Sequence, residues 1–325
     1  MECLILGGSE FIGLHVVREL LRRRHRVAVL NRGTRNHRLP AGVEVLLADR
    51  KEHAALRARL QGRGFDAVFD IAYAPTTAED VRAAVEALDG RVGHYLFCSS
   101  TRVYDHTAPL PFTESTPRSL YWGEYARHKL EAEDLLLERH RAAGLPVTLV
   151  RPTHVLGPYN TRDNETFFFD RILRGRPVLV PGDGGWLRQF GHVEDLALAF
   201  AEMAGNPRAF GQAYNVTGEE CVTQAGFVEL IAHVMGKPVE LVYFDPRLLE
   251  GFERPGRVFG QNLVYPAHIF YSTAKARLEL GLRPRYTLEA GLRQTYEWYL
   301  AEGLDRRPVE SAFEDQLLGR LGRGR

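Results

Sequence analysis

The chain has few cysteines, no excess of charge and no long apolar segment. Its 325 residues include three cysteines, Cys3, Cys98 and Cys221, an odd number without metal-ligand spacing. This argues against a disulfide framework and favours a reducing compartment. Forty-two Lys and Arg against forty-one Asp and Glu leave a net charge of +1, which gives no global attraction to nucleic acid. No apolar run or leader-like N-terminus predicts a membrane segment, so cytoplasmic location is the default expectation.

Short buried runs alternate with longer amphipathic ones. Strand-like runs at residues 2–6, 26–30, 43–47, 67–71, 94–98 and 146–150 alternate with helical runs at 12–24, 52–60, 78–88 and 121–141. This alternation predicts an α/β fold with a doubly wound parallel sheet (Rossmann). In such a sheet the carboxyl ends of the strands meet at one edge, where ligands bind.

A glycine-rich turn joins the first predicted strand to the first predicted helix. It reads GGSEFIG at residues 7–13. A strand, glycine turn and helix form a dinucleotide site, because helix N-terminal N–H groups face the pyrophosphate and bare glycines allow close approach. The second strand ends at Asn31-Arg32, near the adenosine ribose. Asn31 replaces the usual ribose-gripping carboxylate and Arg32 can meet a 2′-phosphate, so NADP(H) is favoured, with NAD(H) as the alternative.

Three side chains suited to acid–base chemistry follow. Tyr125 and Lys129 lie four residues apart in a helical pattern and therefore share one face. An ammonium beside a phenol favours the phenolate, which lets a phenol act as a base nearer neutrality. Ser100 follows a buried strand and stands at the carboxyl edge of the sheet. Each feature alone also fits a solvated helix stripe or a serine cap; together with the glycine turn they favour an enzyme.

These segments together resemble the extended short-chain dehydrogenase/reductase superfamily of NAD(P)-dependent sugar-nucleotide epimerases, dehydratases and reductases. Downstream, RPTHVLGP at residues 151–158 and RQFGHVED at residues 188–195 resemble two further motifs of the superfamily. The GGSEFIG turn and the Asn-Arg-Gly at residues 31–33 are similar to a subgroup of chloroplast stem-loop RNA-binding proteins and their bacterial relatives. The likeness spans nearly the whole chain.

The resemblance implies roles for the matching positions. Tyr125 would be the general acid/base, Lys129 would hold the nicotinamide ribose, and Ser100 would hydrogen-bond the reacting oxygen. The residues expected at the cofactor are Gly7, Ser9, Glu10, Phe11, Ile12, Asn31, Arg32, Asp49 (near the adenine amine), Arg50, Ala72, Tyr73, Ser99, Tyr125, Lys129 and Pro152. Arg102, His154 and Arg188 would contact the substrate, with Arg188 as a phosphate anchor. No metal site is implied.

The resemblance also implies a division of the chain. Residues 1–152 would form the dinucleotide-binding domain, residues 153–305 a smaller C-terminal substrate lobe with crossings back to the first domain, and residues 306–325 a tail. Composition shifts after Pro152, where prolines and the GDGG turn at residues 182–185 break the regular rhythm. In the tail, Leu317, Leu318 and Leu321 predict either a docked helical face or a frayed end.

Several positions depart from the superfamily pattern. Glu10 replaces the middle glycine, and its carboxylate would repel a pyrophosphate unless it turns outward or finds a cation. Asp70 replaces a common histidine beside the cofactor. The superfamily's 4,6-dehydratases carry an Asp-Glu pair where this chain has Thr101 and Arg102. Arginine stays charged and cannot be that acid or base, so dehydration is not expected.

The sequence therefore predicts an NAD(P)-dependent epimerase or ketoreductase that acts on a sugar or nucleotide sugar, as a homodimer. Two alternatives stay open: an RNA-binding protein that keeps the nucleotide fold without turnover, and a sensor that binds NADP(H) and signals through its shape. The balanced charge and the presence of Ser100, Tyr125 and Lys129 together favour the enzyme over RNA binding.

Overall fold

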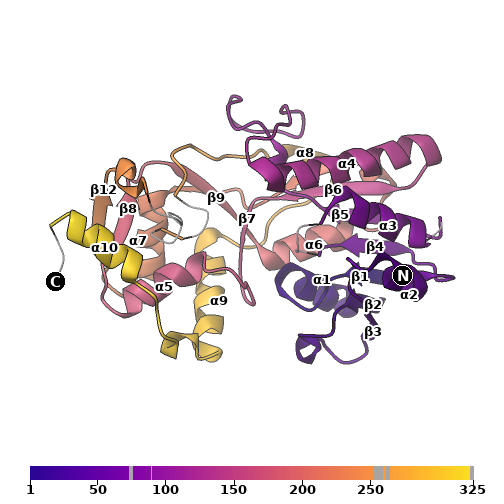
Figure 1. Cartoon of the computed structure of the whole chain (residues 1–325), viewed down its shortest axis with the longest axis horizontal. Coiled ribbons are helices and arrows are strands. Elements are labelled where there is room, and N and C mark those ends of the chain that lie inside the picture. Colours follow the sequence, from indigo (N-terminus) through magenta and orange to yellow (C-terminus); the bar gives the residue numbers. More distant parts are fainter. Residues whose placement is uncertain (73–75, 89, 252–258, 261–263, 323–325) are drawn as a thin grey trace. The chain divides into compact units, whose positions relative to one another are not determined.

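A computed structural model describes residues 1–72, 76–88, 90–251, 259, 260 and 264–322. The chain divides into two compact units, each made of three segments. The first unit comprises Met1–Val155, Val193–Thr217 and Tyr271–Arg285, and the second Leu156–His192, Gly218–Phe270 and Tyr286–Arg325. The colours of Figure 1 follow this passage of the chain from one unit to the other. Over these described ranges, none of the helices has both the length and the apolar character needed to cross a membrane.

The first unit is built on a seven-stranded sheet whose paired strands all run parallel. The strands are β1 (Glu2–Leu6), β2 (Arg26–Asn31), β3 (Glu44–Leu47), β4 (Ala67–Asp70), β5 (Tyr95–Cys98), β6 (Val147–Pro152) and β10 (Gln212–Val216). Their order in space is β10-β6-β5-β4-β1-β2-β3, so the chain winds outward from β1 in both directions. The predicted doubly wound Rossmann sheet is confirmed, and β10 adds a strand to the six expected.

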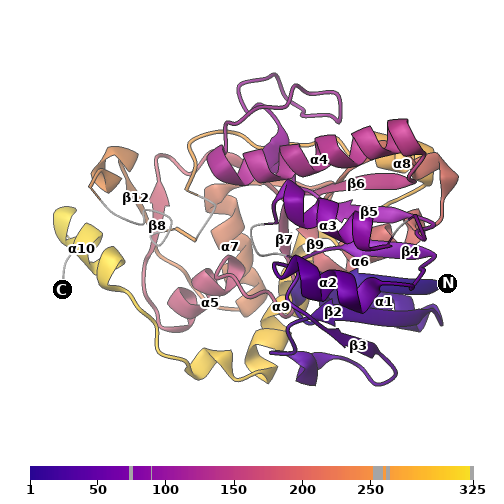
Figure 2. The same cartoon turned by 45° about the vertical axis from the view of Figure 1, so that its right-hand side comes forward.

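Helices cover both faces of this sheet (Figure 2). They are α1 (Phe11–Arg22), α2 (His53–Leu60), α3 (Ala78–Leu88), α4 (Gly123–Ala143), α6 (Val193–Met203) and α8 (Ala274–Leu280), with the 3-10 turns η1 (Asn36–Arg38), η2 (Thr101–Val103) and η3 (Pro207–Ala209). One apolar cluster joins α1 and α6 to the sheet through Val17 and Phe200. The other joins α2, α3 and α4 through Leu56, Val81 and Leu136.

The second unit contains shorter strands and a separate core. Its elements are β7 (His154–Leu156, at the crossover from the first unit), α5 (Glu165–Leu173), β8 (Val178–Pro181), β9 (Leu187–His192), β11 (Cys221–Thr223), α7 (Gln224–Met235), β12 (Leu241–Phe244), η4 (Pro246–Leu249), α9 (Leu288–Ala301), η6 (Leu304–Arg306) and α10 (Ala312–Arg320). β8 pairs with β12 in parallel, and β9 pairs with β11 antiparallel. Aromatic rings, among them Phe168, Phe190 and Phe227, fill the core.

Helix α10, near the end of the chain, is docked on the second unit rather than frayed. Leu317 and Leu318 of α10 are buried in a cluster with Leu179, Val242 and Phe244. Arg171 of α5 holds Glu314 of α10 by two nitrogen–oxygen contacts of 2.7 Å, and both side chains are buried. Apolar burial and a bidentate ion pair therefore act on the same helix.

Glu165 is a buried carboxyl at the first residue of α5. Its nearest donors are the backbone nitrogen of Gly157, at 3.4 Å, and the side-chain nitrogen of Asn160, at 3.4 and 3.5 Å from the two oxygens. No basic side chain pairs with it in the described part of the chain. Burial without a cation raises the pKa of Glu165 to about 7.

This carboxyl should make stability depend on pH. A group whose pKa is raised in the folded state favours folding when protonated, and that contribution is lost as the pH rises from about 4.5 to about 7. Over this window the free energy of unfolding of the wild type should fall by about 2–4 kcal/mol relative to Glu165→Gln. Urea unfolding at a series of pH values measures this. Glu297→Gln, an exposed control on α9, should keep the wild-type dependence; a parallel response of the wild type and Glu165→Gln would contradict the assignment.

Candidate active site

The turn between β1 and α1 is closed by direct backbone contact. Gly7 and Gly8 have φ angles of 114° and 90°, in the region that favours glycine. A Cβ on Gly13 would lie 2.7 Å from the backbone nitrogen of Gly8, so a larger residue does not fit. Ser9 lies within this turn, and Phe11 and Ile12 begin α1. The helix therefore presents its N-terminal N–H groups at the carboxyl end of β1, where an anion can bind.

The end of β2 is shaped by Asn31. Its side-chain oxygen accepts a hydrogen bond from the backbone nitrogen of Gly33 at 2.8 Å, whereas its buried side-chain nitrogen has no partner among the described residues. Arg32, next in sequence, is exposed. Glu10, the cap residue of α1, forms an ion pair of 2.5 Å with Arg35. The carboxylate in the glycine turn has thus found a cation.

Arg50, predicted at the cofactor, pairs with a buried carboxylate. Its guanidinium is buried and contacts the two carboxylate oxygens of Asp70 at 2.5 and 3.1 Å. The hydroxyl of buried Tyr95 donates to the same carboxylate at 2.7 Å. This triad accounts for Asp70 in place of histidine, since the carboxylate neutralises Arg50 and satisfies Tyr95. The two terminal nitrogens of Arg50 are therefore engaged by Asp70, and the predicted place of Arg50 at the cofactor stays a prediction.

Three further predicted cofactor positions lie at or just after the carboxyl ends of β3, β4 and β6. Ala72 lies beside the glycine turn, since a Cβ on Gly7 would be 3.5 Å from its backbone. Asp49 accepts a hydrogen bond from the backbone of Lys51 at 2.9 Å. Pro152 ends β6, and its carbonyl accepts a hydrogen bond from Thr101 at 3.3 Å. Tyr73 lies outside the described residues.

Helix α4 brings Lys129 to the end of β5. Its ammonium donates to the carbonyl of Cys98 at 2.7 Å, two residues before Ser100. Ser100 is buried, and its hydroxyl caps η2 by accepting from the backbone nitrogen of Arg102 at 3.2 Å. Tyr125 lies one turn before Lys129 with 37% of its surface exposed. Of the three predicted catalytic residues, Ser100 thus follows β5, and Tyr125 and Lys129 belong to the helix that contacts the end of this strand.

Arg102 is held over aromatic rings. Its guanidinium carbon lies 4.4 Å from the centre of the Trp122 ring and 5.9 Å from that of Tyr125. Contacts of this kind favour a guanidinium over aromatic faces. A positive charge is therefore fixed beside Tyr125, at a position that the sequence assigned to the substrate.

A buried polar network that the sequence did not reveal lies beneath these residues. Glu133, fully buried on α4, accepts hydrogen bonds from Ser99 at 2.6 Å and from two nitrogens of Arg151 at 2.8 and 2.6 Å. Arg151 also contacts the Tyr104 hydroxyl at 3.0 Å, which donates to Asn215 of β10 at 2.6 Å. The Ser99 hydroxyl, predicted at the cofactor, is thus engaged by Glu133. The signal in the sequence was the position of Glu133, one further turn along the face of Tyr125 and Lys129.

The other two predicted substrate residues lie in β7 and β9. His154 begins β7 and is half-buried. Arg188 of β9 is buried, and its terminal nitrogens donate to the backbone carbonyls of Leu187 and Ala267 at 2.7 and 2.6 Å and to that of Tyr265. These two terminal nitrogens are therefore engaged by backbone carbonyls, and the role of Arg188 as a phosphate anchor stays a prediction.

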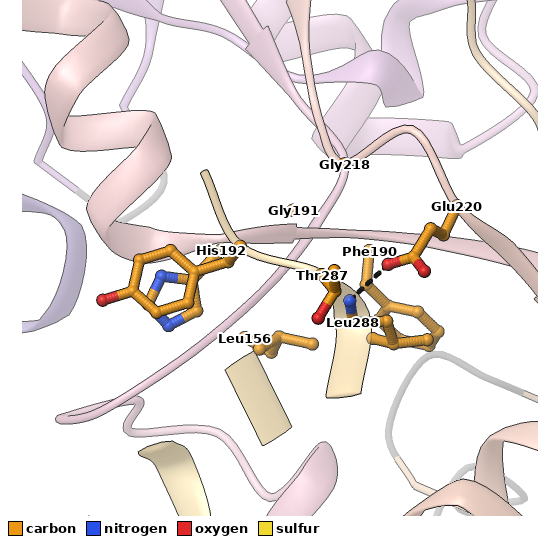
Figure 3. A pocket seen from close by; sticks show the side chains of 9 residues that line it. Leu156, Phe190, Gly191, His192, Gly218, Glu220, Thr287 and Leu288 are labelled. Atoms are coloured by element: carbon orange, nitrogen blue, oxygen red, sulfur yellow. Dashed lines mark hydrogen bonds between the residues drawn. The ribbon is translucent and has the colours of Figure 1, made fainter. Parts of the chain in front are cut away.

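The second unit contains a pocket whose polar side chains contact other protein groups (Figure 3). It is lined by Leu156, Phe190, Gly191, His192, Gly218, Glu220, Tyr286, Thr287 and Leu288. The His192 ring stacks on Tyr286 with ring centres 3.8 Å apart. Glu220 accepts a hydrogen bond from the backbone nitrogen of Leu288 at the start of α9. In this pocket, His192 therefore packs on a ring, and Glu220 binds the N-terminal end of α9.

Comparisons with known proteins identify the family of the chain. Residues 3–217 match the NAD dependent epimerase/dehydratase family. The chain belongs to this family. It is 33% identical to the chloroplast stem-loop binding protein of 41 kDa b from Arabidopsis thaliana, covering 98% of this chain and 84% of that protein. It is 28% identical to dTDP-glucose 4,6-dehydratase from Streptomyces niveus, covering 97% of each.

Solved structures agree on the fold. UDP-glucuronic acid 4-epimerase from Bacillus cereus, in complex with UDP-glucuronic acid and NAD, has a TM-score of 0.77 at 18% identity. The match covers 93% of this chain and all of that one. The two proteins thus share the fold. In the present chain, this fold carries the glycine turn, the end of β2 and the residues of β5 and α4.

The Glu133 network should be required for folding of this epimerase/dehydratase family member. Glu133→Gln leaves the buried Arg151 charge without its carboxylate, and should lower the free energy of unfolding by about 3–5 kcal/mol. Asp134→Asn, at the next residue, removes an exposed partner of Arg118 and should cost less than about 1 kcal/mol. Urea unfolding followed by circular dichroism compares them. Equal losses would show that the buried network is not a major source of stability.

Proposed function

We propose that this chain is an NAD(P)-dependent epimerase or ketoreductase acting on a sugar or nucleotide sugar. The observation that carries the proposal is the arrangement at the end of β5. Lys129 reaches the Cys98 carbonyl from α4, Ser100 follows two residues later, and Tyr125 lies exposed one turn before the lysine. An acid/base, a cation and a hydroxyl at the carboxyl edge of a parallel sheet suit proton and hydride transfer.

The glycine turn fits the dinucleotide that this chemistry needs. Gly13 packs on the backbone of Gly8, so the N-terminus of α1 is open to a pyrophosphate. The unpartnered side-chain nitrogen of Asn31 and the exposed Arg32 lie at the end of β2, where the adenosine ribose would bind. When bound, the nicotinamide would accept or supply the hydride. The family relative from Bacillus cereus was solved with NAD, which supports the cofactor class.

The protein groups would then divide the remaining work. Tyr125 would exchange a proton with the reacting hydroxyl or ketone, and Ser100 would hold that oxygen by a hydrogen bond. Lys129 would supply positive charge beside the phenol and hold the nicotinamide ribose. Arg102, fixed over Trp122, would contact the substrate. Because Thr101 and Arg102 offer no acid/base pair, epimerisation or ketone reduction suits the site better than loss of water.

Cofactor binding tests this proposal first. NADP(H) or NAD(H) at a hundred times its dissociation constant should stabilise the fold by about 2.7 kcal/mol, visible as a rise in melting temperature. Arg32→Ala should weaken NADPH about tenfold or more and leave NADH nearly unchanged, because the guanidinium reads the 2′-phosphate. Fluorescence titration of both nucleotides measures this. Equal losses would mean that Arg32 does not read the phosphate, and no binding of either cofactor would refute the proposed function.

Turnover tests the acid/base. A screen of nucleotide sugars for cofactor reduction or epimer formation supplies the assay substrate. Tyr125→Phe removes the proton-transferring hydroxyl with little change in volume, so the variant should fold, keep its cofactor and lose about a hundredfold or more in kcat. Tyr121→Phe, at an exposed tyrosine nearby, is the matched control and should retain turnover. Full activity of Tyr125→Phe would exclude the proposed mechanism.

The second candidate function is RNA binding. It is favoured by the relative named as a chloroplast stem-loop binding protein, which the chain matches over nearly its whole length. The charge balance of +1 argues against a strongly basic surface. The retained Ser100, Tyr125 and Lys129 arrangement gives the enzyme reading the stronger support.

Affinity for RNA should accordingly be weak and salt-sensitive. Binding to a stem-loop RNA should be lost by about physiological ionic strength, because phosphate neutralisation alone would supply it. Filter-binding titrations at low and moderate salt, with and without NADPH, measure the effect. Tight binding that survives moderate salt and competes with NADPH would make RNA binding the better assignment.

A further inference from the structure

The loop after β2 carries a second arginine at the glycine turn. The Nε atom of Arg35 lies 2.5 Å from a carboxylate oxygen of Glu10, and the two side chains are 46% and 41% exposed. Glu10 occupies the N-cap position of α1, so the guanidinium of Arg35 lies beside the helix end that would face a pyrophosphate. Arg32 belongs to the same loop, three residues earlier.

Hydrogen bonds hold residues 31–38 in a compact turn. The Asn31 side chain accepts from the backbone of Gly33, and Gly33 has a φ of 83°, which favours glycine. The backbone nitrogen of Asn36 donates to the Gly33 carbonyl at 3.4 Å, and that of Arg38 to the Arg35 carbonyl at 3.2 Å. Hydrogen bonds within the turn that follows β2 therefore fix the backbone position of Arg35.

The Glu10–Arg35 pair is suited to exchange. An exposed ion pair contributes only about 0–1 kcal/mol, so a stronger anion can displace the carboxylate. A phosphate is such an anion, because its oxygens accept paired hydrogen bonds from the planar guanidinium. Among the described residues, Glu10 is the only ion-pair partner of the Arg35 side chain.

We propose that Arg35, together with Arg32, recognises the 2′-phosphate of NADP(H), and that Glu10 occupies Arg35 until the phosphate arrives. This inference rests on the proposed function, because it takes the dinucleotide site as given. Glu10 then acts as an internal competitor that lowers the affinity for NADP(H) without touching the 2′-phosphate. Arg35 and Glu10 together set the preference between the two cofactors.

Two adenosine nucleotides that differ only in the 2′-phosphate isolate this effect: adenosine 2′,5′-bisphosphate and adenosine 5′-monophosphate. By calorimetric titration, Arg35→Ala should weaken the bisphosphate about tenfold or more and the monophosphate less than about twofold. Glu10→Gln should tighten the bisphosphate about threefold or more and the monophosphate less. Arg26→Ala, an exposed arginine at the opposite end of β2, should change neither. Melting temperatures of all variants verify folding.

Equal losses for both nucleotides in Arg35→Ala would overturn the role of Arg35. Weaker or unchanged bisphosphate binding in Glu10→Gln would overturn the competition. The parent proposal is tested separately by titrating NADPH and NADH into the wild type. If neither binds, the proposed function fails, and this inference with it. If both bind and Arg35→Ala leaves their affinity ratio unchanged, this inference alone fails.

Discussion

The arrangement of the candidate site depends on the hydrogen bonds that the buried carboxylate of Glu133 accepts. It receives Ser99 from the end of β5 and Arg151 from β6, and it belongs to the helix that carries Tyr125 and Lys129. Through Arg151 and Tyr104 the network continues to Asn215 of β10. One buried charge thus joins three strands and one helix. The same helix brings Lys129 to the Cys98 carbonyl.

Buried ion pairs of this kind are not simply a source of stability. Two charges removed from water lose hydration that their attraction only partly restores, and apolar side chains of similar volume often stabilise as well. A bidentate pair does, however, require one relative position of its partners. We therefore interpret the Glu133 and Asp70 networks as devices that define where strand ends and helices lie. The catalytic candidates are arranged upon them.

Much of this arrangement could be predicted from the sequence, because the elements are strongly periodic. Six strands and four helices of the first unit follow from apolar runs and amphipathic patterns, and GGSEFIG locates the first turn. The strand β10 escaped prediction, since it lies far along the chain from the β6 strand that it pairs with. Arg50 and Arg188 show the same limit. Whether an arginine faces a ligand or a buried partner depends on contacts with residues distant in sequence, such as Asp70 and the Ala267 carbonyl.

The interrupted course of the chain has a consequence for synthesis. The first unit draws α6 and β10 from Val193–Thr217, yet α1 packs against α6 on one face of the sheet. When residue 155 leaves the ribosome, α1 is present on that face but α6 is not yet made. At roughly 5–20 residues per second, the end of α6 at Met203 follows after about 2–10 s. During this interval the nascent sheet exposes apolar surface that a chaperone could bind. The division of the first unit into separate segments of the chain therefore makes its synthesis more dependent on chaperones.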